Sequence, residues 1–570
     1  MKNFKVALIG MLLLSALSWW ACNKENLTSG GKIVDVAFAG RIMDETGAAI
    51  AGAQVNVGGK MVLTDDNGVF RTEQVQLPDN DAILKVSKTG YFDFSRAYFV
   101  EDEALQTVTI QLLRRIQVGS FNNASGGTVN IPGGVSLKFP ANTADASGTI
   151  RVYARYLNPT DEELGLFMPG DLRAIDAGGE EQTLGTFGMV AVELESSAGK
   201  TQIATGKEVE LSMPIVNTQA ADAPADIPLW YFDTEKARWI EEGTAQKVGN
   251  KYVGTVKHFS FWNCDVGLPL VQLSGKVYIG DLEHPLVGAQ VQLTTTATNW
   301  PSYATTDANG CFSGGVIKDA EMVLPIQSFD QCGTLILYTQ TIGPFSSNTM
   351  LQPIILSSSA FEFTTISGTL VDCSGQPVTN GYIRLSASEV AFADENGVFS
   401  YDLIDCGGVS SIIVQAFDLD NLKESPLQTV AIPANGGNVA LGNITVCTGL
   451  DEYIQYTLDG QTFTASEPYG GLIDSMNTNQ TIYLYREASG TTTIISLSFN
   501  ASQPGTYPMT YFSVNNLGVS QAQMGNITTN LTTFAANVGD YFMGTFSGSF
   551  QDNQGVNHMI SGSYRVKRDY

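Results

Sequence analysis

A six-residue pattern occurs three times in this 570-residue chain. It consists of Asp, any residue, Asn-Gly, any residue and Phe, and its copies begin at Asp65, Asp307 and Asp394. Two strand-like runs that contain glycine precede each copy. Repeats of roughly 80–90 residues indicate a series of small modules, so the fold has to be inferred module by module.

The residue composition favours β-structure. Hydrophobic residues make up 43% of the chain and aromatic residues 10%, which is enough to form several cores. Thr, Val, Ile, Tyr and Phe occur in short runs interrupted by glycine, as is typical of strands joined by turns. No long segment keeps a 3.6-residue hydrophobic period, so helices should be minor.

The first residues have the pattern of an export signal. Lys2 and Lys5 precede an apolar stretch, Val6–Leu17, that is too short to span a bilayer comfortably. The following Trp19-Trp20-Ala21-Cys22 resembles the lipobox of bacterial lipoproteins, although Trp19 stands where Leu is usual. The resemblance implies cleavage before Cys22, diacylation of Cys22 and attachment to a membrane. The alternative is an ordinary secretory signal in which Cys22 is incidental.

The chain is strongly acidic, with a formal net charge of −26 at pH 7. Such a charge repels phosphate backbones and anionic lipid surfaces, so nucleic acid is not an expected partner and peripheral electrostatic membrane binding is disfavoured. The acidic residues are dispersed along the sequence, and a solubilising surface charge is the simplest explanation for them.

Residues 35–115 resemble the carboxypeptidase regulatory-like domain, a seven-stranded, transthyretin-like Greek-key sandwich. The landmarks Gly52-Ala53-Gln54-Val55, the Asp65 pattern and Gly90-Tyr91-Phe92 occur in that family's order. Residues 271–357 and 364–448 match more loosely because they lack the Gly-Tyr-Phe element. The resemblance implies an all-β fold, a tandem array of Greek-key β-sandwich domains.

Two further segments are β-rich in another way. Residues 116–268 are similar to the module found beside regulatory-like domains in extracellular matrix and cell-surface proteins, and residues 449–570 to C-terminal modules of bacterial surface lipoproteins. Gly544–Phe550 and Ser561–Val566 alternate in polarity around a turn and predict a terminal hairpin. The predicted division is a signal peptide at 1–21, a tether at 22–34, regulatory-like domains at 35–115, 269–358 and 359–448, the cell-surface-type module at 116–268 and a C-terminal β-domain at 449–570.

Six cysteines remain after Cys22, and an even number in an exported chain predicts up to three disulfides. Cys311 with Cys332 is the favoured pair because both lie within one repeat, and the other pairings stay open. A metal site is the alternative, but no Cys-x-x-Cys pair and no His cluster supports it. The candidates are Cys264, Cys311, Cys332, Cys373, Cys406 and Cys447.

The Asp-x-Asn-Gly element could indicate a calcium loop. An EF-hand loop needs a bidentate Glu at its twelfth position, where the three copies have Gln76, Lys318 and Asp405. A turn explains the element better, because Asn-Gly adopts positive φ at little cost, the Asp caps the turn and the Phe anchors the next strand. No metal and no cofactor is therefore expected.

No catalytic residues are predicted. The three histidines, His258, His284 and His558, form no zinc-peptidase motif, and the aromatic surroundings of His258 favour a packing role. A Gly-x-Ser-x-Gly elbow and a phosphate-binding loop are also absent from the sequence. The separation of a glycosidase carboxylate pair cannot be read from sequence, so a cryptic hydrolase stays as a third alternative.

One loop of the second repeat suggests ligand contact. The gap between Gly288 and Asp307 is longer than in the other repeats and contains Trp300 and Tyr303. Exposed, these rings could stack on a sugar or anchor a protein partner; alternatively, they fold back on their own sandwich.

The sequence thus predicts a non-enzymatic, lipid-anchored protein of the cell envelope, with the outer membrane as the expected location. It would act as a structural spacer or as an adhesion or binding stalk, built of sandwiches in a row. The alternative function is that of a carbohydrate-binding surface lipoprotein in a glycan-uptake system.

Overall fold

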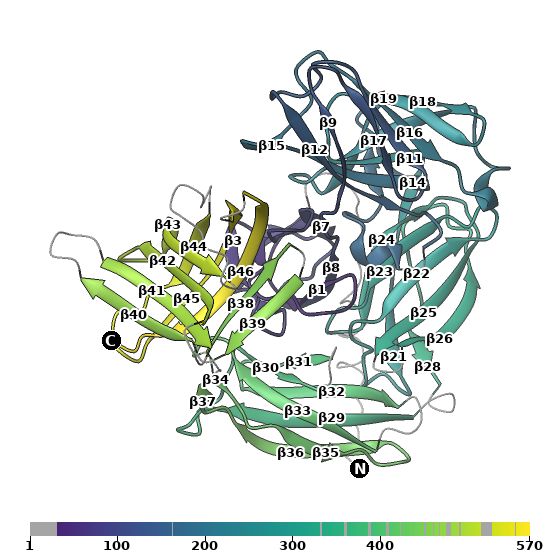
Figure 1. The fold of residues 1–570 in the computed structure, drawn as a ribbon. Coiled ribbons are helices and arrows are strands. Elements are labelled where there is room, and N and C mark those ends of the chain that lie inside the picture. The colour runs from purple at the N-terminus through teal and green to yellow at the C-terminus, as the bar shows by residue number, and fades with distance from the viewer. Residues whose placement is uncertain are drawn as a thin grey trace, which may run out of the picture. The chain divides into compact units, whose positions relative to one another are not determined.

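The structure is a computed structural model that describes residues 31–570 except 162, 331–332, 358–361, 386–388, 406–409, 422, 450–451, 460, 467, 475–479, 489–491, 515–526 and 553–554. It divides into two compact units, unit 1 with residues 31–416 and 427–445 and unit 2 with residues 417–426 and 446–570. Regular structure is almost entirely β-strand, which confirms the all-β fold class (Figure 1). In the described ranges, no helix has the length and apolar character needed to cross a bilayer.

Repeat 1 is a sandwich of two sheets. Its first strand pairs antiparallel with β4 and β5 along one edge and parallel with β8 along the other, and the second sheet has the order β3-β2-β6-β7. Burial alternates along β6, as expected for a strand with one face in the core. The strands are β1 (Ile33–Asp44), β2 (Gln54–Val57), β3 (Lys60–Leu63), β4 (Val69–Arg71), β5 (Val75–Pro78), β6 (Ala82–Ser87), β7 (Phe94–Tyr98) and β8 (Ala104–Leu112).

Repeats 2 and 3 have the same topology as repeat 1. In each, the first strand pairs antiparallel with the strand that follows the Asn-Gly turn and parallel with the last strand of the repeat. Repeat 2 contains β21 (Leu270–Ile279), β22 (Gln290–Thr295), β23 (Pro301–Thr305), β24 (Cys311–Ile317), β25 (Met322–Asp330), β26 (Gly333–Ile342), β27 (Thr349–Met350) and β28 (Ile354–Leu356). Repeat 3 contains β29 (Glu362–Val371), β30 (Gly381–Arg384), β31 (Val390–Phe392), β32 (Val398–Asp405), β33 (Ser411–Asp418), β35 (Gln428–Ala431) and β36 (Gly437–Thr445).

The repeated pattern forms the same turn in all three repeats. The Asp Oδ1 atom accepts the backbone N–H groups two and four residues ahead, at 2.8–2.9 Å. The glycine has a φ of +72°, +72° or +75°, and the Phe that follows is at most 3% exposed. The interpretation of the pattern as turn chemistry is therefore confirmed.

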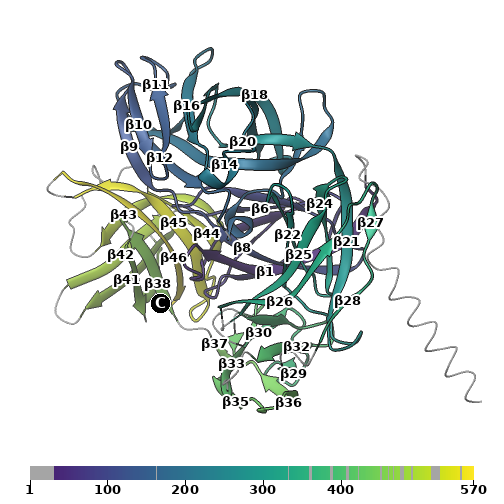
Figure 2. The same ribbon diagram turned by 90° about the vertical axis from the view of Figure 1, so that its right-hand side faces the viewer.

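The segment between repeats 1 and 2 forms one 12-stranded sheet, the large-sheet domain. The strand order of the sheet begins with β10 and ends with β9, and Figure 2 shows these two strands side by side, with a bridge between Asn122 and Gly126. Both faces of β14 are buried: Val190 and Val192 belong to the domain's own core, whereas Met189 and Ala191 pack with Phe92 of repeat 1.

The elements of the large-sheet domain are β9 (Gln117–Asn122), β10 (Gly127–Ile131), β11 (Val135–Phe139), β12 (Thr149–Leu157), α2 (Leu164–Phe167), β13 (Arg173–Ile175), β14 (Glu181–Ser196), β15 (Gly199–Thr201), β16 (Val209–Pro214), η1 (Asn217–Gln219), β17 (Asp226–Asp233), β18 (Arg238–Val248), β19 (Lys251–Val256) and β20 (Phe261–Leu268).

Unit 2 is built on a nine-stranded antiparallel meander. Its last two strands form the predicted terminal hairpin, with Tyr541 opposite Lys567 and Gln551 opposite Asn557. The first and last parts of the meander meet where Gly470 bridges Arg568. The strands of the unit are β34 (Lys423–Glu424), β37 (Thr448–Gly449), β38 (Tyr453–Leu458), β39 (Gln461–Ser466), β40 (Tyr469–Asp474), β41 (Gln480–Ala488), β42 (Thr492–Asn500), β43 (Gly505–Val514), β44 (Thr528–Thr533), β45 (Tyr541–Gln551) and β46 (Asn557–Lys567).

Candidate functional site

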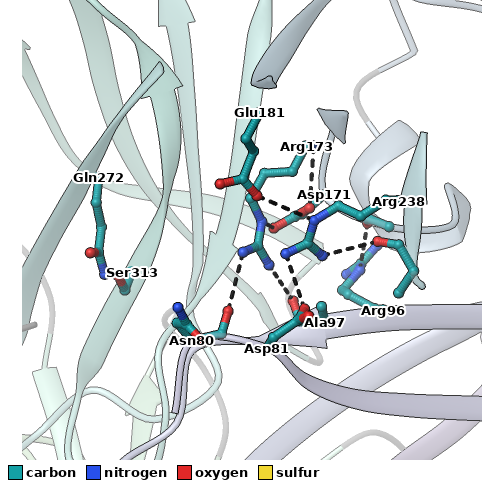
Figure 3. Close-up of polar contacts among 12 residues, drawn as sticks. Asn80, Asp81, Arg96, Ala97, Asp171, Arg173, Glu181, Arg238, Gln272 and Ser313 are labelled. Atoms are coloured by element: carbon teal, nitrogen blue, oxygen red, sulfur yellow. Dashed lines mark hydrogen bonds and ion pairs between the residues drawn. The ribbon is translucent and has the colours of Figure 1, made fainter. Parts of the chain in front are cut away.

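Within unit 1, repeat 1 contacts the large-sheet domain and repeat 3, and it lines a cavity together with repeat 2. The first contact depends on Arg173 of β13, which is 1% exposed. Its guanidinium donates to the carbonyl oxygens of Asn80 at 3.3 Å and Ala97 at 3.0 Å, and to the Asp171 carboxylate at 2.5 Å (Figure 3). Burial lowers the pKa of Arg173, and the adjacent Asp171 opposes that shift.

Two further arginines complete what we call the arginine junction, defined by Arg96, Arg173 and Arg238. Arg238 of β18 forms ion pairs with Asp81 at 3.0 Å and Glu181 at 3.3 Å (Figure 3). The Arg96 guanidinium satisfies carbonyl groups around the end of α2 that lack partners within the helix. It donates at 2.8 Å to each of the carbonyl oxygens of Gly165, Met168 and Gly170.

Trp300 and Tyr303, the predicted ligand-contact residues, lie against the large-sheet domain. The Trp300 ring covers Gly185, where an added Cβ would be 2.5 Å from the ring, and its centroid is 6.0 Å from that of Phe187. The Tyr303 ring covers Gly165 in the same way, at 2.4 Å, and burial raises its pKa. These rings therefore attach repeat 2 to its neighbour, and a role in contacting a sugar or a partner stays a prediction.

The Asn-Gly turn of repeat 1 docks on β30 of repeat 3. The Tyr382 hydroxyl donates to the Asp65 carboxylate and accepts a hydrogen bond from Asn67 Nδ2 at 2.8 Å. Arg384 donates to Asn67 Oδ1 at 2.8 Å, and Arg71 donates to backbone carbonyls of repeat 3. Removal of the Asp65 carboxylate from water raises its pKa to about 6.

A cavity of about 370 Å³ lies where repeats 1, 2 and 3 meet. One wall comes from β8, a second from residues 283–287 after β21, and the third from β29, β31 and β32 of repeat 3. Its volume falls in the range of ligand-binding cavities, which commonly lie at domain interfaces. The lining consists of Leu105, Thr107, Ile279, Glu283, His284, Pro285, Leu286, Val287, Ala308, Thr365, Glu389, Val390, Ala391, Phe392, Ser400, Tyr401, Asp402 and Ile404.

The Asp402 carboxylate is the polar centre of this cavity. Its Oδ2 lies 3.2 Å from Nδ1 of His284, and its Oδ1 accepts a hydrogen bond from the Thr365 hydroxyl at 2.6 Å. In a nucleophile relay, the hydroxyl would donate to the imidazole and the carboxylate would hold the other ring nitrogen. Here hydroxyl and imidazole both bond to the carboxylate, so this Thr–Asp–His group orients Asp402 and does not activate Thr365.

The other two histidines have structural contacts. His258 packs on Tyr231 and Trp262, with centroid distances of 4.6 and 5.1 Å, and burial lowers its pKa. Its predicted packing role is confirmed. In unit 2, burial lowers the pKa of His558, but hydrogen bonds to Asp459 and Asp552 outweigh that effect and raise it.

The disulfide prediction holds for some cysteines and fails for one. Cys311, Cys373 and Cys447 are each disulfide-bonded. Cys264 is a free thiol, so its assignment as a disulfide candidate is wrong: it lies on β20 inside the core of the large-sheet domain, and burial raises its pKa. The remaining candidates, Cys332 and Cys406, lie outside the described residues.

Cys22, the predicted lipid-attachment site, also lies outside the described residues, as does the predicted signal peptide before it. Within the described ranges, no group of three His, Cys, Asp or Glu side chains is arranged to hold a metal ion.

No protein-family model matches the chain. A search of curated proteins also found no match. Among solved structures, the minor pilin GBS52 of Streptococcus agalactiae is 11% identical with a TM-score of 0.14, and the match covers 32% of this chain and 97% of the pilin. The shaft pilin SpaA of Lactobacillus rhamnosus GG is 10% identical with a TM-score of 0.17, covering 32% and 99%. The major pilin subunit BcpA of Bacillus cereus is 12% identical with a TM-score of 0.12, covering 73% and 100%. Similarity at this level supports no inference about function.

Proposed function

We propose that the chain is a non-enzymatic, lipid-anchored binding protein of the cell envelope whose unit 1 acts as one rigid scaffold. The observation that carries this proposal is the arginine junction. Arg173 is withdrawn from water between repeat 1 and the large-sheet domain, and its hydrogen bonds go to groups of both. Separating the two bodies would remove these partners, and breaking a buried charge pair costs about 3–5 kcal/mol.

A scaffold of this kind suits presentation of a surface better than catalysis. The contacts of Arg96, Trp300 and Asp65 fasten the large-sheet domain and repeats 1, 2 and 3 to one another at separate points. Loops and cavities of unit 1 are therefore held at fixed separations, as an adhesion or spacer protein requires. The Thr–Asp–His arrangement in the cavity supports the non-enzymatic part of the proposal, because it leaves no activated nucleophile.

The proposed location in the cell envelope rests on the lipobox-like sequence at Cys22. One acyl chain gives only marginal membrane binding, whereas two or more hold a protein firmly. Cells that carry Cys22→Ser should release the protein from the membrane fraction, and it should no longer incorporate fatty acid. Membrane retention with continued fatty-acid labelling would refute the anchor.

The scaffold itself is tested by limited proteolysis of the segment 113–116, which joins repeat 1 to the large-sheet domain. The wild-type chain should resist cleavage there, and Arg173→Ala combined with Arg96→Ala should make the segment cleavable. Lys236→Ala, an exposed residue of the large-sheet domain, is the matched control and should change nothing. Independent release of both bodies from the wild-type chain would contradict the proposal, as would turnover of a peptide, ester or glycoside substrate.

A carbohydrate-binding role is the second candidate. The cavity between the three repeats favours it, because its lining includes the aromatic residue Phe392, and Asp402 supplies an oriented acceptor for hydroxyl groups.

A further inference from the structure

We propose that the cavity between repeats 1, 2 and 3 binds a small organic cation, a ligand whose ammonium group is attached to an apolar or hydroxyl-bearing body. This inference rests on the proposed binding function and names the ligand class.

The acidic residues of the cavity lining favour a cationic ligand. Three acidic residues are among those that line the cavity, namely Glu283, Glu389 and Asp402, and the lining contains no Lys and no Arg. His284 is the one basic side chain of the lining, and its Nδ1 is already directed at Asp402. Carboxylates at low-dielectric walls concentrate negative potential, so the cavity attracts cations and repels anionic ligands.

Asp402 retains capacity for a ligand. An ionised carboxylate has about four lone-pair positions, of which His284 and Thr365 occupy one on each oxygen. The two bonds fix the direction of the remaining lone pairs. A primary ammonium group carries three N–H donors and can use them on a carboxylate that is held in this way.

The apolar and aromatic residues of the lining would contact the uncharged part of the ligand. Phe392 is an aromatic residue of the lining, and aromatic rings attract ammonium groups through their negative π-surface. Leu105, Val390 and Ile404 offer apolar surface. The cavity volume of about 370 Å³ lies near the lower end of the range for ligand cavities, so a small molecule fits better than a folded segment of a partner protein.

The test uses the purified mature full chain and matched probes that differ in charge. Glucosamine is compared with glucose and N-acetylglucosamine, and tyramine with its neutral alcohol analogue tyrosol, by isothermal titration calorimetry. We expect the ammonium member of at least one set to bind about tenfold or more tightly than its neutral partners. Added salt should weaken that binding, because the cavity is partly open to solvent.

Two variants and a control locate the site. Asp402→Asn should weaken ammonium binding about tenfold or more, a loss of at least one charge-assisted bond. Leu105→Trp should fill the cavity and abolish binding of every probe; it provides the test if Asp402→Asn fails to fold. Glu395→Gln, which neutralises an exposed acid of repeat 3 outside the cavity, should leave affinity unchanged.

Equal binding of charged and neutral sugars would overturn the cation proposal and support the carbohydrate-binding role instead. Absence of heat with every probe, on a chain whose melting transition shows that it is folded, would also overturn it. Neither outcome affects the lipid anchor or the scaffold, which membrane fractionation and proteolysis test separately.

Discussion

The Asn-Gly turns of repeats 1 and 3 have the same internal hydrogen bonds and different surroundings. In both, the Asp carboxylate accepts two backbone N–H groups. Asp394 is exposed to solvent, whereas Asp65 is covered by Tyr382 of another repeat. The local pattern therefore encodes the turn, and the complementary surface on β30 encodes its docking. The same motif forms only a turn in repeat 3, whereas in repeat 1 it forms the turn and also contacts repeat 3.

The largest effect should come from Gly68→Val and Gly397→Val, because both turns need a residue without a side chain. A Cβ at Gly68 would be 2.3 Å from the carbonyl oxygen of Ile42, and one at Gly397 would be 2.7 Å from that of Leu370. The positive φ alone costs about 1–3 kcal/mol for a β-branched residue, and the clash adds to it. Denaturant unfolding of each variant measures the loss of stability.

Gly375→Val is the control for the clash. This glycine has a φ of +82° in a similar turn, but a Cβ there would meet no atom within 4 Å. Gly375→Val should lower the free energy of unfolding only by the cost of positive φ, which is clearly less than the loss expected for Gly68→Val. Equal losses in the two variants would show that the close approach to Ile42 is unimportant.

Tyr382→Phe should have the next largest effect, and it separates docking from turn formation. Loss of the hydroxyl removes the donor to Asp65 and the acceptor of Asn67, and an unpaired buried polar group costs about 1–3 kcal/mol. Phe392→Leu, a change to a ring 6.1 Å away on the same sheet, controls for general loosening of repeat 3. Hydrogen exchange of residues 65–70 should accelerate in Tyr382→Phe while that of residues 394–399 should not; equal acceleration in both turns would contradict a docking role.

These turns also show which features were predictable from the sequence. The pattern predicted the turn glycines and the buried Phe70 correctly, because their causes lie within six residues of chain. The contact of Tyr382 with Asp65 joins residues 317 positions apart, and no local periodicity signals it. Trp300 was noticeable as an aromatic residue in a long loop, but its target, Gly185, became apparent only when the sheets were assembled.

The candidate cavity was unpredictable for the same reason. His284 and Asp402 are 118 residues apart, and neither stands in a motif with chemical meaning. The prediction for Cys264 was wrong because an even number of cysteines says nothing about which of them are buried. Cys264 is a free thiol in a core cluster that contains no other described cysteine. The contact between the large-sheet domain and repeat 1 was also unpredictable, because the outer face of β14 that packs with Phe92 has the sequence of any apolar strand.

A pH titration should reveal a smaller difference between the two turns. The pKa of Asp65 is raised to about 6 in the folded chain, above its ordinary value of 3.8. A raised folded pKa gives a stabilising contribution that is complete below the ordinary value and is lost as the pH rises through about 6. The docking of repeat 1 on repeat 3 should therefore weaken between about pH 4 and pH 6, measured as faster hydrogen exchange of residues 65–70 after correction for the intrinsic pH dependence. Asp65→Asn should remove this pH dependence, and its persistence in that variant would assign the effect to another group.

Calcium should have the smallest effect, namely none, on either turn. In each turn, Oδ1 of the Asp already accepts two backbone N–H groups, and the twelfth position lacks the bidentate Glu of a calcium loop. At Asp65 the second carboxylate oxygen is also occupied, by the Tyr382 hydroxyl. Asp394 is exposed to solvent, so weak metal binding should appear at the turn of repeat 3 first. The melting temperature measured with calcium and with a chelator should be the same for the wild-type chain. A chelator-sensitive transition that Asp394→Asn abolishes and Asp65→Asn leaves in place would restore calcium binding at the third repeat, and with it a functional difference between two turns of identical local geometry.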